Sequence, residues 1–224
     1  KAIEPGTYTV VLEPRAVADL IPNLISSFDA RVNDEGRGTF SKSGGGTRLG
    51  EKIADERVTI FSDPSDPELQ AQPFDNAGLP LRRLVYIDKG ILKSFTYDRF
   101  WAQKQGVAAT GAAAAAGVHF AGGTKSVDEL IAGTERGVLV THFFYIRFLD
   151  PRTVLLTGLT RDGTFLIERG KVTQPLKNFR WNESPLFMLN RIDEIGRAER
   201  VSVDQVMPAL RVRDFNFTSL SDAV

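Results

Sequence analysis

The spacing of hydrophobic residues changes period several times along the chain. Residues 6–14, GTYTVVLEP, are rich in Thr, Tyr and Val, which predicts a strand. Apolar residues then recur at helical spacing from Val17 to Phe28, behind Pro14, a residue that suits the first turn of a helix. Pro22 falls inside this pattern and predicts a kink or a split in the helix.

The later part of the chain is dominated by strand patterns. Residues 81–98 predict a hairpin, because two apolar runs flank the tight-turn sequence Asp88-Lys89-Gly90. Asp162-Gly163 and Arg169-Gly170 are expected to form two further tight turns. Strands are expected at residues 56–64, 118–122, 137–150, 153–176 and 205–220.

Three short helices are expected between these strands. Residues 99–106 form one, and residues 126–133 form another that begins with the capping box Ser126 and Glu129. The last begins at Ser184-Pro185, with Leu186, Leu189, Ile192 and Ile195 on one face, and is expected to stop at Gly196. This order predicts one α+β domain over residues 1–224, with an antiparallel-rich twisted sheet or sandwich and a few short helices.

Two segments lack any apolar period and are expected to be mobile loops. Residues 33–50 contain the stretch SKSGGG, which invites comparison with a phosphate-binding loop. The four-residue gap from Gly45 leads to Gly50, but Glu51 follows and Lys52 comes one place late, so the motif fails. Residues 109–117, which contain five consecutive alanines, are the second such loop.

Composition narrows the classes of function. The 28 Lys and Arg residues balance 28 Asp and Glu residues, so no net charge draws the chain to nucleic acid, and direct nucleic-acid binding is not expected. No apolar run reaches the roughly 20 residues needed to cross a bilayer, and no membrane association is expected. Cysteine is absent, which fits a cytoplasmic protein.

His142 and Arg161 are the candidate site residues. Strand alternation places Val140, His142 and Phe144 on one face, so His142 is either a half-buried, locally hydrogen-bonded histidine or a contact to a metal or substrate. His119 has the same alternatives. Arg161 could bind a substrate carboxylate. Two histidines are too few for most zinc sites unless carboxylates or another chain contribute, so no cofactor is expected in this chain alone.

Several segments, in order, resemble the C-terminal half of the TldD/PmbA proteins, which are described as modulators of DNA gyrase and as zinc-dependent peptidases. The matching segments are EPGTYTVVLEPRAVADLI, LGEKIADERVTIFSDP, QPFDNAGLPLRRLVYIDKGILKSFTYDRFWAQKQGVAATG, DELIAGTERGVLVT and GTFLIERGKVTQPLKNFR. The resemblance covers almost the whole chain. It implies a domain separated from an N-terminal partner, a peptide substrate, and a homodimer or a heterodimer with a related subunit.

The resemblance also implies zinc in the full-length protein or complex. The family's His-Glu-x-x-x-His motif belongs to the N-terminal half, and nothing here matches it. In zinc-binding members a cysteine between the last helix and the closing strand completes the site, whereas the corresponding interval, residues 196–207, contains none. Either the chain resembles the non-catalytic members, or another ligand, for which His142 is the candidate, replaces the thiolate.

Overall fold

The computed structural model describes residues 1–111 and 116–222 of the chain. Its strands are β1 (Gly6–Leu12), β2 (Ile60–Ser62), β3 (Leu84–Asp88), β4 (Ile91–Leu92), β5 (Val118–Phe120), β6 (Arg136–Asp150), β7 (Leu155–Glu168), β8 (Lys171–Pro175), β9 (Phe179–Glu183), β10 (Ile192–Ser202) and β11 (Gln205–Leu220). Its helices are α1 (Pro14–Ile25), the 3-10 turn η1 (Ser26–Phe28), α2 (Ala30–Asp34), α3 (Arg99–Gln105), α4 (Val127–Ala132) and α5 (Pro185–Met188). None of the helices in these two ranges has the length and hydropathy to span a bilayer.

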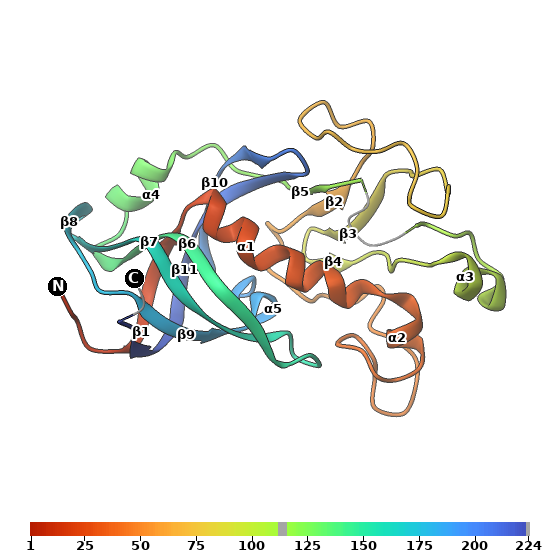
Figure 1. Cartoon of the computed structure of the whole chain (residues 1–224), viewed down its shortest axis with the longest axis horizontal. Coiled ribbons are helices and arrows are strands. Elements are labelled where there is room, and N and C mark those ends of the chain that lie inside the picture. Colours follow the sequence, from red (N-terminus) through yellow and green to blue (C-terminus); the bar gives the residue numbers. More distant parts are fainter. Residues whose placement is uncertain (112–115, 223–224) are drawn as a thin grey trace.

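The long strands close into a barrel. β1 pairs with β6 on one side and with β11 on the other, and β7 and β9 complete the path from β6 back to β11. Figure 1 shows this barrel beside the termini, with α1 lying across it. Closure is partial, because β1 pairs with β6 only at residues 10–12, and β6 beyond Val140 is paired with β7 on one side.

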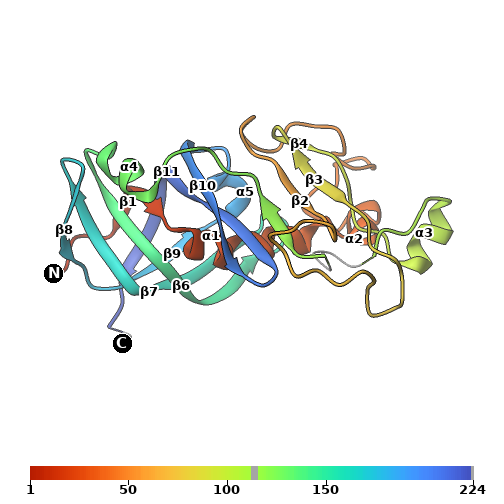
Figure 2. The ribbon, with the colours of Figure 1, turned by 90° about the horizontal axis from the view of Figure 1, so that it is seen from above.

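A smaller sheet extends from the barrel. The first residues of β11 pair in parallel with β5, and β5 continues through β2 and β3 to β4 (Figure 2). The α+β expectation is therefore confirmed in its coarse form. The sheet is mixed, because β1 pairs with β6 and β11 pairs with β5 in the parallel sense, so the antiparallel description was incomplete.

The barrel has a packed interior and a covered outer face. Val10 and Leu12 point into the main apolar cluster, which also contains Trp181, Phe215 and Phe217. Val11 points the other way and is still fully buried, because it packs in a second cluster with Leu130 and Ile131 of α4. This two-sided burial explains why three successive residues of β1 are apolar. Phe215 and Phe217 of the closing strand β11 are likewise buried in the core.

Helix α1 runs unbroken through Pro22, so of the kink or split that Pro22 predicts, the split does not occur. Its buried face includes Val17, Leu20, Ile21 and Leu24, as the helical spacing predicted. In the same turn, the side-chain amide of Asn23 donates to the carbonyl oxygen of Asp19 at 3.0 Å. This bond adds a local donor beside the proline, which has no N–H of its own.

Two sequence predictions of turns and helices are wrong. Asp162-Gly163 is no turn between strands, because β7 continues through it; Asp162 adopts a φ of 59° where the pairing with β6 shifts register. The last helix ends at Met188, and Ile192–Ser202 form β10, paired with β11. Ile192 and Ile195 are buried in the core as expected, but from a strand interrupted by register shifts.

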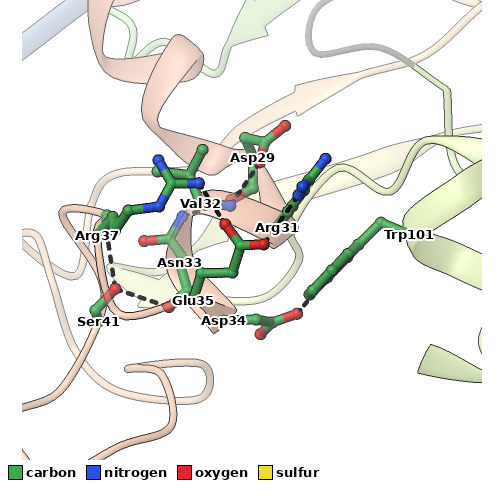
Figure 3. A network of polar contacts seen from close by, with 10 residues as sticks. Asp29, Arg31, Val32, Asn33, Asp34, Glu35, Arg37, Ser41 and Trp101 are labelled. Atoms are coloured by element: carbon green, nitrogen blue, oxygen red, sulfur yellow. Dashed lines mark hydrogen bonds and ion pairs between the residues drawn. The ribbon is translucent and has the colours of Figure 1, made fainter. Parts of the chain in front are cut away.

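The start of the glycine-rich loop is anchored rather than free. The buried Asn33 donates to the carbonyl oxygens of Ser27 and Asp29 and accepts from the backbone N–H of Phe40. Figure 3 shows Asn33 beside Asp34, whose carboxylate accepts a hydrogen bond from Trp101 Nε1. Phe40 is fully buried against Phe28. Beyond Ser41 the loop is also bonded, from the backbone N–H of Arg48 to the carbonyl oxygen of Phe40 at 2.8 Å. The mobility expected for residues 33–50 stays a prediction. Of the other predicted mobile loop, 109–117, residues 112–115 lie outside the described ranges.

Candidate functional site

His142 lies between two carboxylates. Its Nδ1 atom is 2.9 Å from Oδ2 of Asp162 on β7, and its Nε2 atom is 3.6 Å from Oδ2 of Asp19 on α1. The register shift at Asp162 places that carboxylate beside the imidazole instead of in a turn. This arrangement corresponds to the half-buried, locally hydrogen-bonded histidine. A role of His142 in holding a metal or a substrate stays a prediction.

Asp19 joins the helix to the edge of the barrel. Its Oδ2 atom accepts a hydrogen bond of 2.9 Å from the backbone N–H of Phe143, and Arg15 lies 3.3 Å from its other oxygen. Burial raises the pKa of Asp19, while the Phe143 N–H, His142 and Arg15 act in the opposite direction. Asp19 therefore provides a hydrogen-bond acceptor for the N–H of Phe143, just beyond the point where β6 stops pairing with β1.

Arg161 lies directly opposite His142 in the β6–β7 ladder, so the structure brings the two predicted site residues together. The guanidinium carbon of Arg161 is 4.3 Å from the centre of the Phe144 ring, and its Nε atom is 3.7 Å from Asp162. A guanidinium that stacks on an aromatic ring keeps donors available in its plane. The binding of a substrate carboxylate by Arg161 stays a prediction.

The other histidine belongs to a separate cluster that sequence reasoning missed. Nδ1 of His119 on β5 is 2.6 Å from Oδ2 of Asp66, and the imidazole stacks on Phe61 with ring centres 4.7 Å apart. Ligand atoms of Asp66, Glu68 and His119 all lie within 4.8 Å of one another. The two carboxylates come from the irregular segment between β2 and β3. Only strand pairing brings His119 beside them, so no local motif could have revealed the group.

This cluster adjoins the interval where the resemblance places a cysteine. Residues 196–207 form most of β10, the turn after it and the start of β11, and Val206 of β11 pairs with His119. The backbone N–H of Gln70 donates to Val203 at 2.7 Å. Strand pairing therefore places His119 beside residues 196–207. His142 lies elsewhere, on the β6–β7 ladder. Residues 196–207 contain no cysteine, so they cannot supply the zinc-binding thiolate that the resemblance implies.

A groove follows β3 on the smaller sheet. Two adjoining cavities of about 340 Å³ and about 200 Å³ share the lining residues Leu84, Ala108 and Thr110. The larger cavity also has Arg82 and Arg83 in its wall, and the smaller one has Lys93. Arg83 is held by Asp63 at 3.2 Å and lies over Phe61. Hydrogen bonds from Ser65 lower the pKa of Asp63 most, and Arg83 adds to the effect. An apolar floor with cationic walls suits a ligand that carries a carboxylate.

Comparisons with known proteins agree on the family to which this chain is related. A family model described as the PmbA/TldA metallopeptidase C-terminal domain matches residues 5–219. A protein from Archaeoglobus fulgidus named as a metalloprotease is 33% identical over 133 residues, which are 59% of this chain and 27% of that protein. One from Saccharolobus solfataricus named as a zinc metalloprotease TldD homolog is 24% identical over 216 residues, covering 86% of this chain and 44% of that protein.

The solved structures agree on the fold. A Bacteroides thetaiotaomicron protein whose name makes it a candidate modulator of DNA gyrase aligns with a TM-score of 0.84 and 28% identity, over 98% of this chain and 48% of its own. The chain thus spans less than half the length of these three proteins. Because the family model covers nearly all of the sequence, the chain belongs to the PmbA/TldA metallopeptidase C-terminal domain family.

Proposed function

We propose that this chain is the peptide-accommodating and partner-binding half of a TldD/PmbA-type cytosolic protein, either a zinc-dependent peptidase or its inactive partner. In the peptidase, zinc would polarise the scissile carbonyl and activate water. Its ligands would lie largely outside this chain, because the interval 196–207 has no cysteine and the sequence has no His-Glu-x-x-x-His. The chain would bind small or unfolded peptides without cleaving them.

The observation that carries this proposal is the groove along β3. Its two cavities together are large enough for the side chains of a short peptide. Arg82 has no ion pair within the described residues, so its guanidinium is available to a peptide carboxylate. Arg83, by contrast, is already paired with Asp63 and helps to shape the wall.

A peptide-binding assay tests the proposal. Fluorescence anisotropy with labelled short peptides that have free carboxyl ends should show saturable binding. Ala108→Trp places an indole in the wall shared by both cavities and should weaken binding about tenfold or more, equivalent to about 1.4 kcal/mol. Ala132→Trp on α4 is the control, since Ala132 is exposed and α4 packs on the barrel. Equal affinity of the two variants for the peptide would refute the groove as the binding site. Peptide cleavage by this chain would refute the proposal that it binds peptides without cleaving them.

A second candidate function is a non-catalytic dimerisation module, of the kind named for modulation of DNA gyrase. The end of β6 favours it, because Phe144, Tyr145, Phe148 and Leu149 are between 41% and 55% exposed. Clustered exposed apolar side chains of this size mark protein interaction surfaces. A second copy of this chain or a related subunit would cover them. The two functions are compatible, since the groove lies on the smaller sheet.

A further inference from the structure

We infer that Asp66, Glu68 and His119 form a binding site for a divalent cation that belongs to this chain alone. The inference does not rest on the peptide-binding proposal. It revises the expectation that this chain alone holds no metal, an expectation that was conditional on no carboxylate joining a histidine. The structure supplies two such carboxylates.

The first argument is the donor set. One imidazole and two carboxylates offer three ligand atoms within 4.8 Å of one another. Imidazole suits zinc and its first-row neighbours, and carboxylates accept the same ions as well as harder ones. Three protein ligands with remaining positions for water are a common arrangement for a divalent metal. The site is therefore expected to prefer Zn²⁺ over Mg²⁺, because Mg²⁺ gains little from a nitrogen ligand.

The second argument is charge. Two carboxylates meet here, and across residues 1–111 and 116–222 neither has a Lys or Arg within ion-pair distance. Arg83, the cation of this region, is bound to Asp63. Asp66 is only 8% exposed at its side chain, so solvent compensates its charge poorly. A bound cation would offset the repulsion between the two carboxylates.

The third argument is preorganisation. The His119 ring is fixed by stacking on Phe61, which in turn lies under Arg83 at 4.1 Å. The loop that carries Asp66 and Glu68 is tied to the turn after β10 by the bond from Gln70 to Val203. The strand that carries His119 is tied to the same turn by the 2.8 Å bond from Val118 to Asp204. The ligands are thus held on segments that share one anchor, which lowers the entropic cost of binding.

Binding at Nδ1 would require one local change. The 2.6 Å between Nδ1 of His119 and Oδ2 of Asp66 is a hydrogen-bond distance. Two ligand atoms of one zinc ion, each about 2.0–2.2 Å from it, lie farther apart than this. The cation would therefore release the proton of this hydrogen bond to solvent and push the two side chains apart by less than about 1 Å. Glu68 is exposed and can move toward the ion.

Nuclear magnetic resonance gives a direct test, because the chain has two histidines and hence two imidazole spectra. Addition of one equivalent of Zn²⁺ to the 224-residue chain should shift the His119 resonances, with His142 as the internal reference. His142→Gln assigns the two spectra. Shifts confined to His142, or no shift in either ring at saturating Zn²⁺, would overturn the inference.

Calorimetric titration of variants supplies the second test. Glu68→Gln keeps the size of an exposed side chain and removes its charge, so the chain should stay folded while the affinity for Zn²⁺ falls about tenfold or more. Glu56→Gln is the matched control at another exposed glutamate and should bind like the parent. Circular dichroism checks the fold of both. Equal affinities for the two variants would show that Glu68 is no ligand and would overturn the three-residue site.

Discussion

Asn33 is the residue whose replacement should loosen the beginning of the glycine-rich loop. It is fully buried and makes three hydrogen bonds of 2.7 to 2.8 Å, to Ser27, Asp29 and Phe40. Asn33→Ala removes all three and leaves the N–H of Phe40 without this acceptor in a buried position. Each bond contributes about 1 kcal/mol net, so the free energy of unfolding should fall by about 3 kcal/mol.

The expected size of the effect makes it measurable by two methods. For a chain of this length, about 3 kcal/mol corresponds to a decrease of roughly 6–12 °C in the melting temperature. Urea unfolding should give the same difference with an unchanged m value. Hydrogen exchange should quicken at residues 38–41 before it does so in the barrel strands, because Phe40 is held in place partly by this bond.

Asn76→Ala is the control, since Asn76 is exposed in a turn and its replacement should change stability by less than about 0.5 kcal/mol. A loss below about 1 kcal/mol for Asn33→Ala would mean that the bonds are replaced by water or by local rearrangement. Unchanged exchange at residues 38–41 would show that Phe40 packing alone orders the loop. Either result would refute the role given to Asn33.

Two further predictions concern pH dependence and association. Arg57 lowers the pKa of Asp55 to about 2, so Asp55 contributes stability that is present above its unfolded pKa near 3.8 and is lost as pH falls toward 2. Asp55→Asn should therefore be less stable than the parent at pH 6, and the difference in the free energy of unfolding should vanish near pH 2. A difference that stays constant with pH would contradict the assignment. Light scattering at micromolar concentration should show that the chain is a dimer. Phe148→Glu should disrupt this dimer, whereas Phe187→Glu, at an exposed residue of α5, should leave it intact. A parent chain that stays monomeric when its concentration is raised tenfold would refute the predicted dimer.

Local signals in the sequence predicted the elements whose formation depends on neighbouring residues. The hairpin at Lys89 and Gly90 exists because both residues adopt positive φ, and a Cβ on Gly90 would lie 2.3 Å from the carbonyl oxygen of Ala54. The capping box of Ser126 and Glu129 forms as expected. The turn at Arg169-Gly170 also forms, between β7 and β8. In each case the residue type fixes the backbone locally.

Features set by distant pairing could not be predicted in this way. Ile192 and Ile195 are three residues apart, a spacing that fits a helix, but pairing with β11 makes the segment a strand with register shifts. The barrel closes through the parallel pairing of β1 with β6, whose partners are more than 120 residues apart in the sequence. The cluster of Asp66, Glu68 and His119 depends on the same kind of long-range contact, so its sequence signal was limited to an unexplained histidine.

Barrel closure bears directly on how this chain could bind a partner. Strand addition needs a free edge. β6 has one beyond Val140, but its backbone shifts register between Phe144 and Arg147 and again before Asp150, and such bulges disfavour the pairing of a further strand. The edges outside the barrel are also poorly suited. β4 has two residues, and its Ile91 already forms a β-bridge with Lys52. β8 ends at Pro175, whose carbonyl oxygen accepts a hydrogen bond from the amino terminus. Gly196 of β10 forms a β-bridge with Lys125. Side chains, by contrast, are openly presented at the end of β6, where Tyr145 is 55% exposed and Arg147 lies over its ring. Association through aromatic and arginine side chains is therefore favoured over strand addition, since those residue types contribute most to interface stability.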